Sequence, residues 1–98
     1  MKTINLLKQQ ISKIPNKTLR EHNEDWAEYV VNENITISIW NVGVVDIIFR
    51  TMIIHSEPIK EHTDVTEVVN RLQRVIKCCE ELNSIYEECG HYPPETEY

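Results

Sequence analysis

The sequence predicts a single α+β domain with elements in the order α-β-β-β-α. Apolar residues recur at helical spacing at both ends of the chain, while β-branched and aromatic residues dominate residues 26–54. Two short turn segments divide that middle part. We expect a three-stranded antiparallel sheet with a long C-terminal helix across one face. Residues 1–90 form the domain, and residues 91–98 form an extended acidic tail.

The first predicted helix runs from about Ile4 to Ile14. Thr3 is a capping residue type at its start, and Pro15 ends it because the residue before a proline disfavours the helical conformation. Residues 16–25 are polar and charged, so we expect a loop with at most one further helical turn. The apolar stripe of the helix recurs every three or four residues and consists of Ile4, Leu7, Ile11 and Ile14.

Three strands are predicted in the middle of the chain. Residues 26–31 are rich in aromatic and β-branched side chains, and residues 32–34 form a hairpin turn. Residues 35–40 alternate between isoleucine and other side chains, the pattern of a half-buried strand. Residues 41–43 form a second turn, and residues 44–54 form a third, longer strand.

The third strand is apolar on both faces. One face has Val45, Ile47, Phe49 and Ile53, and the other is interrupted by Asp46 and Arg50. A helix on one side of the sheet leaves the second face in water, and an exposed apolar face is typical of an interface. Alternatively, helices cover both faces, or the segment is helical, although its β-branched residues favour a strand. We expect a homodimer with the interface residues Val44, Ile48, Met52 and Ile54.

The long helix is predicted for Val65–Cys89, after a charged loop at residues 55–63. Asp64 is its cap, with Glu67 three residues later, and Gly90 marks its end. Its apolar stripe is broad, which favours packing across a sheet rather than in a two-stranded coiled coil.

The last turns of this helix are acidic, with Glu80, Glu81, Glu87 and Glu88 and no Lys or Arg after Lys77. A helix C-terminus already carries partial negative charge, so acid there is unfavourable. In one interpretation, residues 1–20, which have five basic and no acidic residues, fold against this end. In the other, the glutamates face outward and contact a basic partner.

Composition restricts the partners and the compartment. The net charge of −6 argues against binding to nucleic acids or anionic membranes. No apolar run is long enough for a secretory signal or a membrane helix. The three cysteines fall on the one long helix, where they cannot pair with one another, so we expect reduced thiols in the cytoplasm.

Catalytic and metal-binding motifs are absent from the sequence. It has no nucleophile elbow, no paired-carboxylate motif, no His-Glu-x-x-His and no Cys-x-x-Cys, so we expect neither an enzyme nor a cofactor or metal site. The metal-ligand types in the charged loop are interpreted as solvated side chains. They are His55, Glu57, Glu61 and His62.

These features predict a non-enzymatic protein-binding protein. The leading hypothesis is a small acidic inhibitor, an immunity or counter-defence factor of the phage or viral type, that blocks a basic surface of a nuclease-like effector in the host cytoplasm. The alternative is a homodimeric chaperone or adaptor that holds a protein segment on its apolar sheet face. The candidate partner contacts of the leading hypothesis are Glu80, Glu81, Glu87 and Glu88, with Trp40 as an anchor.

Overall fold

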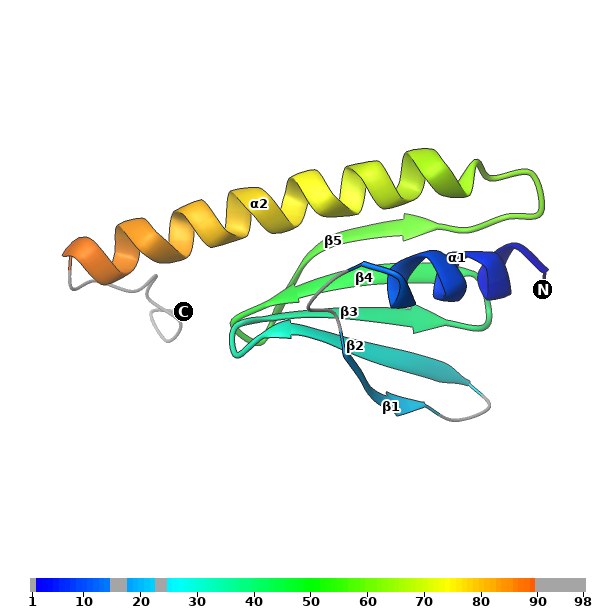
Figure 1. The fold of residues 1–98 in the computed structure, drawn as a ribbon, viewed down its shortest axis with the longest axis horizontal. Coiled ribbons are helices and arrows are strands. Elements are labelled where there is room, and N and C mark those ends of the chain that lie inside the picture. Colours follow the sequence, from blue (N-terminus) through cyan, green and yellow to red (C-terminus); the bar gives the residue numbers. More distant parts are fainter. Residues whose placement is uncertain (1, 15–17, 23–24, 90–98) are drawn as a thin grey trace.

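The computed structural model describes residues 2–14, 18–22 and 25–89 (Figure 1). Helix α1 (Lys2–Ser12) precedes one antiparallel sheet of strand order β1-β2-β3-β4-β5, and helix α2 (Val65–Cys89) follows it. This confirms the α+β class and the long C-terminal helix. The strands are β1 (Thr18–His22), β2 (Trp26–Asn32), β3 (Ile35–Trp40), β4 (Val44–Phe49) and β5 (Met52–Pro58).

The prediction of three strands is wrong, because the sheet has five. β2 and β3 form as predicted, but residues 44–54 divide into β4 and β5 at a turn formed by Arg50 and Thr51. These two residues have φ values of 50° and 76°, and two successive positive φ angles characterise the tight turns of β-hairpins. Neither residue is Gly or Asn, so the usual turn signal was missing.

The other additional strand residues lie in segments that were predicted as loops. β1 forms within residues 16–25, and residues 55–58 extend β5. β1 pairs with β2 at one edge of the sheet, and β5 pairs with β4 at the other. The structure describes the side chains of β2 to β5.

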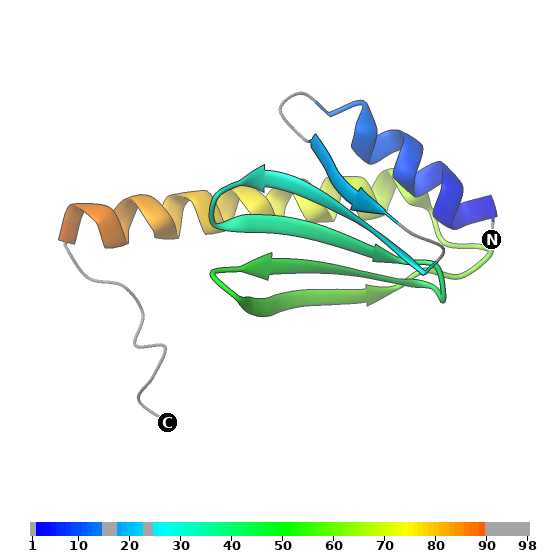
Figure 2. The same cartoon turned by 90° about the horizontal axis from the view of Figure 1, so that it is seen from below.

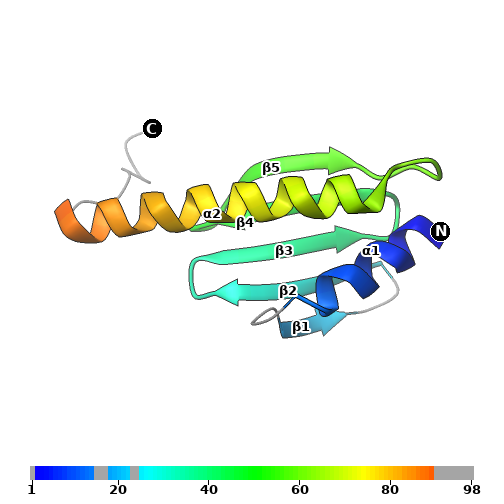
Figure 3. The same cartoon turned by 45° about the horizontal axis from the view of Figure 1, so that its top comes forward.

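Both helices pack on one face of the sheet and leave the other face open. Figure 3 shows α1 and α2 in front of the strands, and Figure 2 looks onto the opposite face. The alternative in which helices cover both faces is therefore wrong for the described residues. The largest fully buried side chains come from both layers of this core and are Ile4, Leu7, Ile11, Ile35, Ile37, Ile39, Val45, Ile47, Val68 and Leu72.

The start of α2 is capped as the sequence predicts. The backbone N–H of Glu67 donates to Asp64 Oδ1 at 3.3 Å, and the N–H of Val68 donates to the Asp64 carbonyl at 3.1 Å. Thr3 has a different role from the predicted one. It lies inside α1, and its hydroxyl donates to the carbonyl of Glu61 at 3.0 Å, which ties α1 to the loop before α2.

The second half of α2 extends past the sheet (Figure 1). The buried side chains of the helix end at Cys79, and of the later ones Tyr86 still packs against the core. Leu82 and Ile85 continue the apolar pattern but are 40% and 53% exposed. The apolar surface of α2 is therefore longer than the sheet that covers it.

Candidate functional site

The open face of the sheet is the largest candidate surface. Residues that are direct partners on neighbouring antiparallel strands point to the same side, so the pairing register assigns each side chain to a face. By this register, the open face carries Trp26, Glu28, Thr36, Ser38, Trp40, Val44, Asp46, Ile48, Ile53 and Ser56.

Two tryptophans lie next to each other at one end of this face. Trp26 and Trp40 are cross-strand partners, with ring centroids 6.2 Å apart and an interplanar angle of 48°. The indole Nε1–H of Trp40 donates to Asp46 Oδ2 at 3.1 Å. Asp46 is only 8% exposed, whereas Trp40 is 38% exposed. The Trp40 ring is thus held in a fixed orientation on the surface by an aromatic neighbour and a buried carboxylate.

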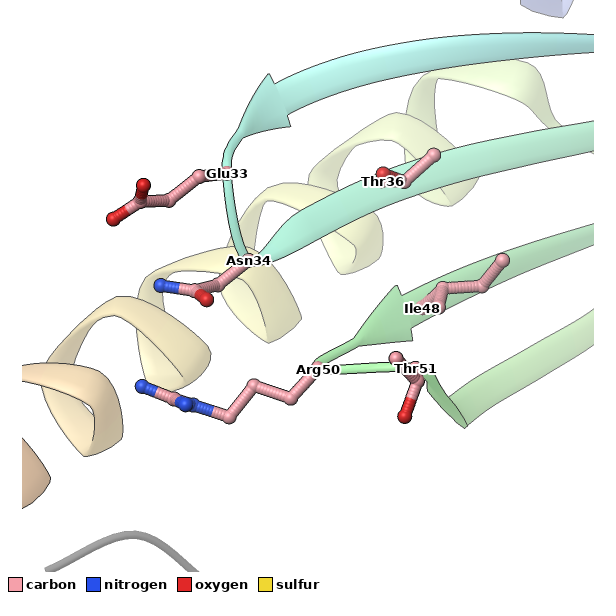
Figure 4. Close-up of a pocket in the computed structure, with 6 residues that line it drawn as sticks. All are labelled: Glu33, Asn34, Thr36, Ile48, Arg50 and Thr51. Carbon is pink, nitrogen blue, oxygen red and sulfur yellow. The ribbon is translucent and has the colours of Figure 1, made fainter.

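Two shallow depressions cross the open face and share Ile48. The first, of about 220 Å³, is lined by Trp26, Glu28, Ser38, Trp40 and Ile48. The second, of about 360 Å³, lies between the two hairpin turns (Figure 4). Figure 4 shows the Asn34 and Arg50 side chains extending toward α2, while Thr36 and Ile48 lie on adjacent strands. Together the depressions make a continuous uneven surface from the tryptophan pair to the turns.

The predicted dimer residues do not share one face. Val44 and Ile48 lie half-buried on the open face, but Met52 pairs with Phe49 and so lies on the helix side. Ile54 lies at a β-bulge, where the alternation of faces breaks. The single continuous strand assumed for residues 44–54 is the reason for this error. The dimer itself stays a prediction.

Ile53 was expected on the core face but is 61% exposed. It pairs with Ile48 and therefore points to the open side. With Met52 at 51% and Ile54 at 43%, it forms an exposed apolar run on the edge strand β5. We call residues 52–54 the apolar edge.

The four glutamates near the end of α2 are all exposed. Successive helix residues differ by about 100° in direction. Glu80 and Glu87 therefore lie on one side of the helix, and Glu81 and Glu88 on another. The four do not make a single patch, although all lie on the part of α2 beyond Cys79.

The basic residues of α1 do not neutralise these glutamates. α1 lies beside the half of α2 that starts at Val65, far from the acidic end (Figures 1 and 3). Among the described side chains at this end, Asn83 Nδ2 donates a hydrogen bond to Glu87 Oε1 at 3.3 Å, a contact within α2 itself. For α1 the neutralising interpretation is wrong; the side chains of Lys17 and Arg20 lie outside the described residues.

His55 and Glu57, interpreted from the sequence as solvated loop side chains, belong to β5, and the half-buried Glu57 contacts α2. Arg71 Nη2 donates to Glu57 Oε1 at 2.9 Å, and His55 Nε2 lies 2.7 Å from Glu57 Oε2. Burial alone would raise the pKa of Glu57, but the hydrogen bonds from Arg71 and His55 outweigh it and lower the pKa. The Glu57 carboxylate therefore joins the edge strand to the helix.

Glu57→Gln is expected to change how stability depends on pH. A carboxyl whose pKa is lower in the folded state stabilises the fold above its unfolded pKa, and this contribution is lost as pH falls through the folded pKa. The wild type should therefore be more stable than the variant at neutral pH, with a difference that shrinks in acid. Urea unfolding at several pH values measures it. Glu61→Gln, at an exposed glutamate in the loop after β5, is the matched control. A change in the free energy of unfolding of Glu57→Gln that is equal at all pH values would contradict the expectation.

Two cysteines have described side chains, and they differ in accessibility. Cys78 is exposed and Cys79 is buried, and both are free thiols. Burial, with smaller effects from Cys78 and Glu80, raises the pKa of Cys79. Reagents that attack thiolates should therefore modify Cys78 first. The Cys89 side chain and the predicted tail, residues 91–98, lie outside the described residues.

In the described ranges, no three His, Cys, Asp or Glu side chains are grouped so that they could hold a metal ion. A search of the same residues found no helix with the length and apolar character needed to cross a membrane. Comparisons with protein-family models, with curated proteins and with solved structures found no match.

Sequence reasoning missed Trp26 and Ile53 as surface residues. The signal for Trp26 was available, because Trp26 and Trp40 are equally distant from the predicted turn and must therefore face each other in the hairpin. No comparable signal existed for Ile53, since its position depends on the unrecognised turn at Arg50 and Thr51.

Proposed function

We propose that this chain is a non-enzymatic protein-binding protein whose main contact surface is the open sheet face. The observation that carries the proposal is the tryptophan pair, in which Trp40 is fixed in orientation yet 38% exposed on a face that no described element covers. Tryptophan is among the residues that most often dominate binding energy at protein interfaces. A ring already held in place loses little conformational entropy on binding.

The shape and charge of the face indicate the kind of partner. Its depressions are shallow and open, whereas small-molecule sites usually enclose most of their ligand. Glu28 lines the depression beside the tryptophans, and Asp46 lies below Trp40. A protein segment with apolar side chains and a neighbouring Arg or Lys would match both the rings and the acidic character of this region. This is the chaperone or adaptor hypothesis in a more specific form.

A second candidate is supported by the exposed glutamates beyond Cys79. In that proposal the end of α2 contacts a basic surface on a nuclease-like effector, and the chain is an inhibitor or counter-defence factor of the phage or viral type in the host cytoplasm. The exposure of Glu87 and Glu88 on the projecting helix supports it. High salt separates the candidates because it weakens an ionic contact much more than an apolar one.

Trp40→Ala should weaken binding of the native partner by about 30-fold or more, the effect of losing an interface anchor. Affinity capture from the native cell supplies the partner, and titration calorimetry with the purified pair measures the affinity. Val42→Ala, at an 85% exposed residue of the turn after β3, is the control and should bind like the wild type. Circular dichroism verifies that each variant is folded.

The same titration compares the two candidates. If Trp40→Ala binds normally while the double change Glu87→Lys and Glu88→Lys weakens binding and removes its salt dependence, the open face is not the contact surface and the second candidate is correct.

A further inference from the structure

Most of the exposed large apolar side chains lie on the edge strand β5 and on the end of α2. Of the eight large hydrophobic residues that are exposed in the described part of the chain, five lie on β5 or beyond Cys79 on α2. β5 is the last strand of the sheet, so one side of its backbone has no neighbouring strand among the residues that the structure describes. An apolar edge strand is a surface on which another strand can pair. The five residues are Met52, Ile53, Ile54, Leu82 and Ile85.

The side of α2 next to this edge changes charge along its length. Arg71, Arg74 and Cys78 line a depression together with His55 of β5, which places this side of the helix toward the edge. Residues seven apart lie on nearly the same side of a helix. Glu67 precedes Arg74 by seven residues, and Glu81 and Glu88 follow it by seven and fourteen. The arginines of this side of α2 therefore lie in its first half, and its last charges are acidic.

We propose that this edge binds a second copy of the chain across a two-fold axis, with β5 antiparallel to β5 of the partner copy. α2 runs antiparallel to β5, so the two α2 helices are then antiparallel as well. Arg74 of each copy then meets Glu81 of the other. The partner is inferred to be a second copy because a two-fold interface must be self-complementary, and this side of α2 carries both charges.

The contacts between β5 and α2 set the position of the axis. Arg71 contacts Glu57, and Asn83 contacts Arg50. With rises of about 1.5 Å per helical residue and 3.3 Å per strand residue, Ile53 lies at the level of residues 78–79 of α2. An axis centred on the apolar edge therefore passes near Cys78. About this axis, Arg74 of one copy approaches Glu81 of the other, and Arg71, which already contacts Glu57 and Glu67 in its own copy, lies opposite Glu88.

The spacing of the helices suits contacts between long side chains. α2 lies nearest to β4, one strand in from the edge. Two such helices are about 14 Å apart, or three strand spacings, if the β5 strands pair. Arg and Glu side chains extending toward each other span this distance, while Leu82 and Ile85 cover the space beneath them.

Ile53→Lys tests the apolar centre of the interface. Sedimentation equilibrium of the full wild-type chain should give twice the 11.6 kDa chain mass at micromolar concentration. The variant should dimerise at least ~10-fold more weakly, because two like charges would face each other at the axis in place of an apolar contact. Val42→Lys introduces the same charge at an exposed turn and should leave the dimer intact.

A charge exchange tests the register. Glu81→Arg alone should weaken the dimer, because it places two arginines against each other. Combining it with Arg74→Glu should restore most of the affinity between the two copies. In this double variant, residues 74 and 81 again carry opposite charges across the interface, with the signs exchanged. A merely structural effect of either substitution would not be reversed by the other.

Cross-linking tests the position of the axis. In the full chain with Cys89→Ser, a short bismaleimide should join two copies through Cys78, and the further change Cys78→Ser should abolish the product. A wild-type chain that stays monomeric at ~50 μM overturns the proposal. At that concentration even a weak dimer with a Kd near 10 μM would be populated. An Ile53→Lys variant that dimerises as well as Val42→Lys, or a double exchange that fails to rescue, overturns the proposal as well.

Discussion

Leu72→Ala should destabilise the protein by about 3 kcal/mol, through lost apolar burial and the cavity left in the core. Leu72 is 0% exposed and lies in the part of α2 that packs on the sheet. For a domain of this size, the loss corresponds to a fall in Tm of roughly 15 °C. Thermal unfolding followed by circular dichroism, together with urea titration, measures both quantities.

Leu82→Ala is the matched control on the same helix. Leu82 is 40% exposed and lies past the last buried residue, Cys79, so we expect a loss of less than about 1 kcal/mol in the monomer. Measurements at low protein concentration separate this effect from dimerisation. Equal destabilisation by the two substitutions would show that the second half of α2 is packed as tightly as the first, contrary to the structure.

Asn83→Ala should lower the free energy of unfolding by about 2 kcal/mol, because it removes several polar contacts at once. This loss is larger than is usual for a half-buried residue at the surface. Asn83 Oδ1 accepts hydrogen bonds from Asn34 Nδ2 at 3.2 Å and from Arg50 Nη2. Asn34 and Arg50 belong to the two hairpin turns at the same end of the sheet. One amide on α2 therefore holds both turns, and its loss leaves the half-buried Arg50 guanidinium without this acceptor.

Ser84→Ala is the control for this substitution. Ser84 is the next residue and is exposed, so its replacement should change the free energy of unfolding by less than about 0.5 kcal/mol. Urea unfolding gives the difference in free energy. Hydrogen exchange should also show faster exchange at the turns in Asn83→Ala alone, and unchanged turn protection would contradict the assigned role.

Much of the fold was predictable where the signal is local. The bounds of α2 follow from Asp64 at its start and Gly90 after its end, and the β2–β3 hairpin follows from the alternation in residues 35–40. The turn at Arg50 and Thr51 was not predictable, because ordinary residues adopt the positive φ angles that usually mark glycine or asparagine. That one missing turn concealed β5 and the true position of Ile53.

The sequence indicated single residues of the candidate site, but not how they are arranged on the surface. Trp40 was predicted to be a partner contact, and its exposure agrees with a surface position. Its hydrogen bond to Asp46 depends on a register between β3 and β4 that no local pattern specifies. The glutamates beyond Cys79 were recognised as unusual, but their separation from α1 required the packing of the two helices.

The sequence by itself determined the helices, their apolar stripes and the excess of acid at the end of α2, because periodicity, capping residues and charge act over a few neighbouring residues. Only the tertiary structure decided that both helices cover the same face, that the tryptophan face stays open, and that β5 forms an apolar edge beside a helix of divided charge. These features arise from the pairing of segments distant in the chain, where small differences in register and packing select one arrangement from many that the local pattern permits.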